Sequence, residues 1–160
     1  MCDTLESQLK EIEERIRKGD PDVILRIDEV AAANPEVATI WTLRAHFHSQ
    51  QSNSVAAVAD WSKAISICNK EPHYYYMRGI ALFLMSEYDR AVLDFTTVIE
   101  LGDLHQSDYY REPAYFFRAD ALVRISRYEE AKSDCQHISD SMTTWTDKLR
   151  TKADILRECS

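Results

Sequence analysis

Residues 74–95 read YYYMRGIALFLMSEYDRAVLDF, in which three tyrosines precede an Arg-Gly pair and a run of apolar residues. Either these aromatic residues form a ligand site, or they belong to one face of a packed pair of helices. The choice depends on whether the same arrangement recurs along the chain, because a pattern repeated at a fixed period indicates repeated structure.

The arrangement does recur. Upstream, five residues match this stretch at an offset of 34 positions: an aromatic, an arginine, two small residues and a second aromatic. They are Trp41, Arg44, Ala45, Ala57 and Trp61, and their counterparts are Tyr75, Arg78, Gly79, Ala91 and Phe95. Downstream, residues 115–135 (YFFRADALVRISRYEEAKSDC) repeat it at an offset of 40, which places six extra residues in the intervening loop. Residues 23–30 form a weaker N-terminal copy, and the period of 34 returns from Tyr115 to Leu149. Two apolar-periodic segments in a period of about 34 residues predict helix-turn-helix repeats.

These residues resemble the tetratricopeptide repeat family, whose pattern combines a bulky aromatic, a small pair, and then Ala, an aromatic and Ala in the second helix. The resemblance covers roughly residues 4 to 157. Two positions depart from it: Cys135 replaces the second-helix aromatic of the last repeat, and Ser52-Asn53 replaces the usual glycine-containing turn. The resemblance implies an all-α helix-turn-helix solenoid with three clear repeats, a degenerate N-terminal repeat and a C-terminal capping helix. It specifies the fold and no ligand.

The expected organisation is one domain, residues 1–160, with repeats at about 4–37, 38–71, 72–111 (including the insertion) and 112–143, and a capping segment at 144–160. Periodicity and helix breakers predict helices near 4–17, 21–33, 38–50, 54–69, 73–85, 88–101, 113–125, 128–139 and 144–158. Gly79 and Ala91 are expected at a close helix crossing, with Tyr75, Tyr88 and Phe95 around it. The last helix is expected to expose a polar outer face made of Asp147, Lys148, Arg150, Asp154 and Arg157.

Composition limits the class of protein. Only 3 glycines and 4 prolines occur in 160 residues, which favours long helices over a turn-rich β fold. The formal charge of −8 predicts no nucleic-acid partner and favours a basic protein partner, because an acidic surface repels phosphates. No apolar run approaches the roughly 18 residues that span a bilayer, and no secretory signal pattern is present. Four widely spaced cysteines indicate reduced thiols, so a cytoplasmic location is expected.

Candidate binding residues follow from the resemblance, which implies that the first helix of each repeat lines a concave surface for a protein or peptide. Side chains just off the core stripe are predicted to point into that groove: Thr42, His46, Tyr76, Ile80, Phe83, Phe116, Asp120 and, beside them, Arg124. For Phe83 and Phe116 the alternative is packing against neighbouring helices. The insertion at 101–113 supplies a second candidate surface through Tyr109 and Tyr110, unless the preceding helix extends into it.

The recurring arginines at 44, 78 and 118 are predicted to pair with acids of a neighbouring repeat, the alternative being a ligand role. Catalytic signals are missing: the sequence holds no glycine-rich phosphate loop and no nucleophile motif. His46 and His48 stand two apart, so on a helix they point in different directions and do not chelate one metal. Neither an enzymatic activity nor a cofactor is expected.

The pattern therefore favours a protein-interaction module that binds one partner stoichiometrically. The leading hypothesis is a bacterial immunity protein that neutralises a cationic toxin domain, since opposite charge steers association. A secretion-type chaperone that binds an extended effector segment is the second hypothesis. A scaffold subunit of a larger complex, or a homodimer, is the third.

Overall fold

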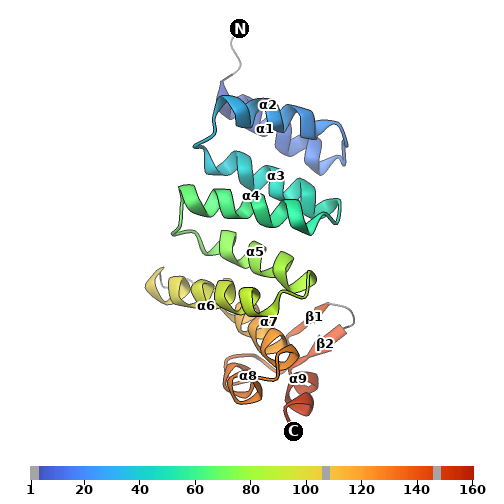
Figure 1. The fold of residues 1–160 in the computed structure, drawn as a ribbon, viewed down its shortest axis with the longest axis vertical. Coiled ribbons are helices and arrows are strands. Elements are labelled where there is room, and N and C mark those ends of the chain that lie inside the picture. Colours follow the sequence, from blue (N-terminus) through green and yellow to red (C-terminus); the bar gives the residue numbers. More distant parts are fainter. Residues whose placement is uncertain (1–3, 106–108, 146–148) are drawn as a thin grey trace. The chain divides into compact units, whose positions relative to one another are not determined.

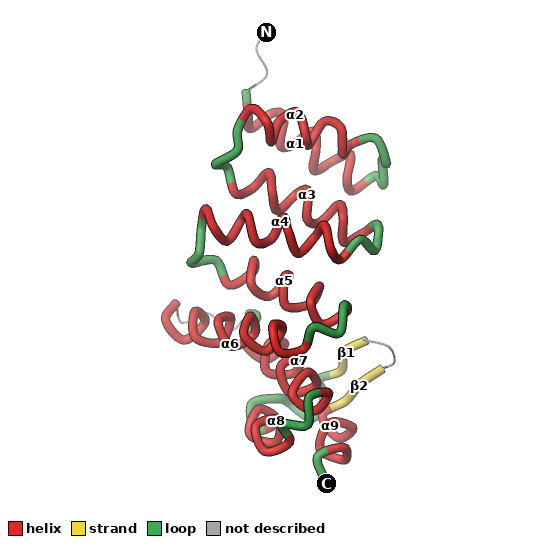
Figure 2. The backbone as a smooth tube through the Cα atoms, in the orientation of Figure 1, coloured by secondary structure: helices red, strands yellow, loops and turns green. Residues whose placement is uncertain are grey.

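The computed structural model describes residues 4–105, 109–145 and 149–160, and it divides into two compact units, residues 1–69 and 70–160. The first unit contains α1 (Leu5–Arg17), α2 (Val23–Ala33), α3 (Ala38–Gln50) and α4 (Ser54–Ile67). The second contains α5 (Pro72–Leu84), α6 (Tyr88–His105), α7 (Arg111–Arg124), α8 (Tyr128–Cys135), β1 (Thr143–Trp145), β2 (Leu149–Thr151) and α9 (Lys152–Glu158), as Figures 1 and 2 show. In the sequence, the boundary between the units falls at residues 69–70, beside the predicted repeat boundary at 71–72; that residues 1–160 act as one domain stays a prediction.

The turn inside three of the repeats uses the same backbone device. Ser52, Ser86 and Ser126, which occupy equivalent repeat positions, have positive φ angles of 57°, 61° and 61°. In each turn the next amide donates to a carbonyl five residues earlier, for example Asn53 to His48 at 2.9 Å. This is the hydrogen-bond pattern that closes a helix through one left-handed residue. Serine therefore takes the position where the resemblance led us to expect glycine.

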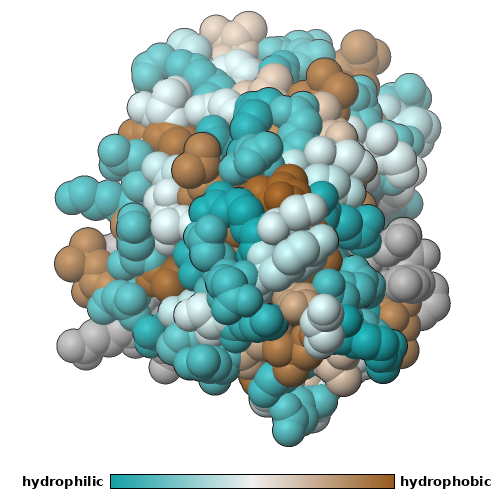
Figure 3. Space-filling model, turned by 60° about the horizontal axis from the view of Figure 1, so that its bottom comes forward, coloured by the Kyte–Doolittle hydropathy of each residue, from teal (hydrophilic) through white to brown (hydrophobic). Residues whose placement is uncertain are grey.

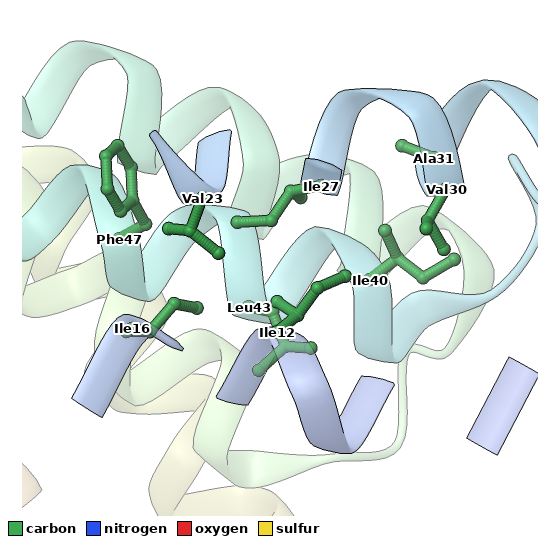
Figure 4. Packing of buried hydrophobic residues seen from close by; sticks show 9 residues of the cluster. All are labelled: Ile12, Ile16, Val23, Ile27, Val30, Ala31, Ile40, Leu43 and Phe47. Atoms are coloured by element: carbon green, nitrogen blue, oxygen red, sulfur yellow. The ribbon is translucent and has the colours of Figure 1, made fainter. Parts of the chain in front are cut away.

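The core of the first unit is built from the facing stripes of α1, α2 and α3. Figure 4 shows its buried members, which are Ile12, Ile16, Val23, Ile27, Val30, Ala31, Ile40, Leu43 and Phe47. Their spacing of three or four residues along each helix places them on one face, as amphipathic helices require. Burying such a stripe supplies most of the free energy that holds short helices together in water.

Close helix crossings occur where the small residues predicted them. Ala57, Ala91 and Ala131 are fully buried, one in the second helix of each clear repeat. At the α5–α6 crossing, a Cβ added to Gly79 would lie 2.9 Å from Cε1 of Phe95. The side chain of Phe95 thus occupies the space that any larger residue at position 79 needs.

A bidentate ion pair joins the first and second helices of each clear repeat. The arginine Nε and Nη2 atoms donate to the two carboxylate oxygens of an aspartate 16 positions later at 2.6–3.0 Å, in the pairs Arg44–Asp60, Arg78–Asp94 and Arg118–Asp134. Each guanidinium also lies over the aromatic ring three positions earlier, at 4.6, 5.7 and 5.4 Å for Trp41, Tyr75 and Tyr115.

The three aspartates of these pairs are almost completely buried. Their main cation comes from the same repeat, which corrects the prediction of a neighbouring repeat's acid. Neighbouring elements add to it: Arg44 also reaches Asp28 of α2 at 2.8 Å, and Arg118 donates to Thr96 of α6 at 2.9 Å. Because a buried carboxylate is stable only with a cation or donors beside it, the pair fixes how the two helices align.

The C-terminal region differs from the predicted capping helix at 144–158. Within the described residues it forms an antiparallel pair of three-residue strands, with Thr144 opposite Arg150, followed by the short helix α9 (Figure 2). Threonine and tryptophan favour extended backbone, and a capping box between Thr151 and Asp154 starts the helix at residue 152. The predicted polar outer face is wrong for Arg150, which is 1% exposed, whereas Arg157 is exposed and Asp154 partly exposed; Asp147 and Lys148 lie outside the described residues.

The described start of the insertion is helical. α6 continues to His105, so the predicted end at residue 101 is wrong and the alternative of an extended helix is the one observed. α8 ends at Cys135, four residues before its predicted end. In the part of the chain that the structure describes, none of the helices is long and apolar enough to cross a membrane.

We expect Arg118→Met to lower the free energy of unfolding by about 3 kcal/mol, because it leaves the buried Asp134 carboxylate without its cation. The double variant Arg118→Met/Asp134→Leu should recover most of this loss, since it removes the stranded charge as well. Urea denaturation of both variants and the wild type measures the coupling. Equal losses in the single and double variants would show that the pair does not act as a unit.

Gly79→Ala should lower the free energy of unfolding by about 1–2 kcal/mol, although alanine is ordinarily the better helix former. The reason is the 2.9 Å approach to Phe95. In a Phe95→Leu background the same substitution should be neutral or stabilising, because the obstructing ring is gone. Thermal and urea denaturation of the four proteins test this, and a stabilising Gly79→Ala in the wild-type background would contradict it.

Candidate functional site: a tyrosine surface on the second unit

A cluster of aromatic side chains lies in the second unit, where α5 begins and where the chain enters α7. The Tyr110 hydroxyl and Nδ1 of His73 are hydrogen-bonded at 2.9 Å. The ring of Tyr110 lies 5.1 Å from that of Tyr76 and 4.7 Å from that of Tyr109, measured between centroids. Residues that are 37 positions apart in the sequence, His73 and Tyr110, thus meet through the fold.

The cluster runs from solvent into the core. Tyr109 is 78% exposed, whereas Phe95 at the other end is fully buried. Phe117 connects the two ends, with ring centroids 6.3 Å from Tyr76 and 5.8 Å from Phe95. Ile80 stands one helical turn after Tyr76 on the same face of α5, and both are partly buried. We call Tyr76, Ile80, Tyr109 and Tyr110 the tyrosine surface.

In His73, Tyr76 and Tyr110 the shift of the pKa favours the uncharged form. Burial lowers the pKa of His73 below its ordinary 6.5. Burial, with the nearby Tyr110 and Tyr109, raises the pKa of Tyr76 to about 12, and burial also raises the pKa of Tyr110. The tyrosine surface therefore offers uncharged rings and hydroxyl groups, which suits contact with a protein rather than proton transfer.

Arg124 is the last residue of α7 and lies beside the C-terminal part of α5. Its guanidinium carbon is 5.7 Å from the ring centroids of both Phe83 and Tyr88, and Nη1 donates to the Tyr88 hydroxyl at 3.4 Å. The residue stays exposed while its cation rests on two aromatic rings. Arg124 thus keeps an accessible surface, and its contact with a partner stays a prediction.

Three other predicted groove residues of the second unit are buried. Phe83 and Phe116 pack against Phe117 at 5.7 and 6.2 Å, which is the packing alternative stated for them. Asp120 is fully buried and accepts a hydrogen bond from Nη2 of Arg150 at 2.6 Å. These side chains line no open groove here, because the extra ring of Phe117 and the C-terminal strand fill the space.

The two candidates in the first unit differ from each other. Thr42 is buried, and its hydroxyl donates to the carbonyl of Thr39 at 2.8 Å, so its side chain is satisfied within α3. His46 is partly buried, with its ring edge against Trp61 at 4.9 Å. Only His46 of this pair keeps an accessible part of its side chain for contact.

Sequence reasoning missed three residues of this region: His73, Phe117 and Arg150. His73 and Tyr110 have no periodic relation that would pair them. Phe117 carried a weak signal, since it extends the aromatic run at 115–116 beyond what the repeat pattern needs. Arg150 was expected in solvent because the capping segment was expected to be helical throughout.

Features that suggest small-molecule or metal chemistry are weak. A shallow depression of about 590 Å³ in the second unit is lined by Arg111, Glu112, Tyr115, Gln136, His137, Ile138 and Ser139. Its polar groups bond to one another: Glu112 accepts the Ser139 amide at 2.7 Å, and the rings of Tyr115 and His137 stack at 4.3 Å. Among the described residues, no three His, Cys, Asp or Glu side chains group as metal ligands would. Burial raises the pKa of Cys135 to about 11, so it is an unreactive thiol.

The fold is similar to that of several solved structures. A crystal structure of MamA has a TM-score of 0.74 at 19% identity, covering 84% of this chain and 75% of that chain. An O-GlcNAc transferase mutant from Thermobaculum terrenum has a TM-score of 0.62 at 21% identity, covering 85% of this chain and 26% of that one. A tetratricopeptide repeat protein from Parabacteroides merdae has a TM-score of 0.57 at 15% identity, covering 82% of this chain and 63% of that one.

At these identities the likeness establishes the fold, and it confirms the nearly all-α tetratricopeptide repeat architecture inferred from the sequence. No family model matches the sequence, and no curated protein does. The function must therefore be argued from the residues.

The His73 environment predicts a pH-dependent stability. A histidine whose folded pKa lies below its unfolded value binds fewer protons when folded, so its contribution is lost as pH falls through that range. Between about pH 7 and about pH 5, the free energy of unfolding should fall less steeply for His73→Asn than for the wild type. Tyr110→Phe should keep the wild-type slope, because burial and not the hydrogen bond sets the shift. Identical slopes for His73→Asn and the wild type, in denaturation at several pH values, would contradict this.

Proposed function

We propose that the chain is a non-catalytic protein-interaction module that binds one partner protein stoichiometrically through the tyrosine surface. The observation that carries this proposal is Tyr109, a large aromatic side chain that is 78% exposed beside a row of packed rings. The exposed ring is supported from behind by Tyr110, which His73 holds in turn. An aromatic residue so placed is the usual anchor of a protein interface.

The support behind Tyr109 matters for affinity. A tyrosine orders only two side-chain torsions on binding, and Tyr110 already restricts the space open to the ring. Less conformational entropy is then lost when a partner covers it. On the face drawn in Figure 3, hydrophilic residues predominate among those in colour, and hydrophobic residues appear in small separate groups. Such a surface favours recognition through a few aromatic anchors and complementary charge over recognition through a broad apolar interface.

The finer proposal is a cytoplasmic immunity protein that neutralises a basic toxin domain. A net charge of −8 favours a cationic partner and faster association at low salt. The burial of Phe83 and Phe116 shortens the apolar groove that an extended segment would need, which favours a folded partner over an extended one. The tetratricopeptide repeat fold of the neighbours supports the general role by analogy.

A secretion-type chaperone that binds an extended effector segment is the alternative, because Tyr76 and Ile80 still lie together on the accessible face of α5. A homodimer differs from the immunity protein and the chaperone because it self-associates. A scaffold subunit differs from them because it needs a third component. Sedimentation of the purified chain separates these cases: the proposed function expects a monomer that forms a 1:1 complex.

The test begins with parallel affinity purifications that use the wild type and Tyr109→Ala as baits. We expect one protein to be enriched by the wild type and lost from the variant. With that protein purified, Tyr109→Ala should weaken binding by about tenfold or more, as hot-spot tyrosines do. Tyr128→Ala is the matched control, since Tyr128 is also exposed but lies on α8 away from the surface. Full affinity in both Tyr109→Ala and Ile80→Ala would refute the assignment.

A further inference from the structure

One position of the repeat holds three different residues, which differ in how far their side chains are buried. His46 of α3, Ile80 of α5 and Asp120 of α7 are equivalent by the offsets of 34 and 40. The first two are partly exposed, whereas Asp120 is fully buried. The difference comes from β2, whose Arg150 places Nη2 2.6 Å from Oδ1 of Asp120. The chain's own C-terminal strand thus covers the position that is open on α5.

The contact between Arg150 and Asp120 is incomplete. In the three repeat pairs, Nε and Nη2 of an arginine engage both oxygens of the aspartate. Here only Nη2 donates to the carboxylate, and only to Oδ1, while Nη1 of Arg150 donates to Glu158 at 2.5 Å. Within the described residues, Oδ2 of Asp120 and Nε of Arg150 are buried without a hydrogen-bond partner. A buried group left unpaired is unfavourable, so the internal arginine satisfies this carboxylate only in part.

β2 is held to α7 mainly by this one side chain. Leu149 is 53% exposed and Thr151 is partly exposed, so Arg150 is the only residue of the three-residue strand that is buried. Its outer anchor, Glu158, is exposed on α9. Arg150 is therefore the side chain through which β2 reaches Asp120 of α7.

We propose that Asp120 is the acceptor of an arginine-recognition site, which Arg150 fills as an internal ligand, and that an arginine-bearing segment of a partner displaces Arg150. The inference rests on the proposed function, because it names the chemistry of the same partner. An arginine that approaches with its Nε and Nη2 toward the carboxylate forms the fork seen in the three repeats and satisfies Oδ2 as well. Arg124, whose Nε lies 3.5 Å from Oδ1 of Asp120, shares the carboxylate without filling the position of the fork.

A small probe tests the site without the partner. N-acetyl-arginine amide is titrated against the full chain by calorimetry and by nuclear magnetic resonance, with N-acetyl-lysine amide as the control ligand. Arg150→Ala should bind the arginine probe at least about tenfold more tightly than the wild type and should melt at a higher temperature when the probe is present. Arg150→Ala/Asp120→Asn should lose this binding. Arg157→Ala, which replaces an exposed arginine of α9, should behave as the wild type does.

If Arg150→Ala does not fold, Glu158→Gln replaces it, since it loosens the outer anchor of Arg150 and leaves Asp120 in place. It too should bind the arginine probe more tightly than the wild type. Equal affinity of the wild type and the loosened variant, equal binding of the lysine probe, or binding that survives Asp120→Asn overturns the inference.

The two proposals fail separately. Tyr109→Ala should leave binding of the arginine probe unchanged, because it lies outside this site. Once the partner is purified, Arg150→Ala should strengthen its binding by about tenfold as the internal competitor is removed. A partner that depends on Tyr109 but gains nothing from Arg150→Ala refutes the inference and leaves the proposed function standing. If no partner depends on Tyr109, the proposed function falls and the probe titration alone decides the arginine site.

Discussion

The ion pair between the two helices of each clear repeat is the constraint on which the other features depend. Each aspartate is nearly removed from water, so its arginine must stay beside it, and this requirement fixes how far one helix slides along the other. The aromatic ring under the guanidinium and the small residues at the crossing are then brought to the same places in the three clear repeats. Because the helices align in the same way, residues at equivalent repeat positions lie on equivalent helix faces.

The candidate site arises where this period is interrupted. α6 extends four residues beyond its predicted end, to His105, and two consecutive tyrosines precede α7. A regular repeat has no counterpart for these tyrosines, and His73 is placed to hold the second of them. Regular repeats therefore provide a rigid support, and the irregular connection provides the exposed side chain.

The C-terminal hairpin is a second departure from the period, and it changes the meaning of Asp120. On α5 the equivalent position is Ile80, which is partly exposed. On α7 the same position holds the carboxylate of Asp120, which the chain's own Arg150 covers. On the aromatic side, Phe117 packs beside the buried rings of Phe83 and Phe116. Accessibility on the inner face thus depends on neighbours that the repeat pattern does not contain.

The sequence by itself determined the helix pairs, their crossings at Gly79 and the alanines, and the separation of α6 from α7, because periodic burial and small residues are local signals. It also named Tyr76, Ile80, Tyr109 and Tyr110. Only the tertiary structure decided that Phe116 and Asp120 are covered, that His73 supports Tyr110, and that Arg150 is buried in a strand rather than exposed on a helix. The physical reason is that these outcomes depend on contacts between residues far apart in sequence, whose side chains compete for the same space without leaving any periodic trace.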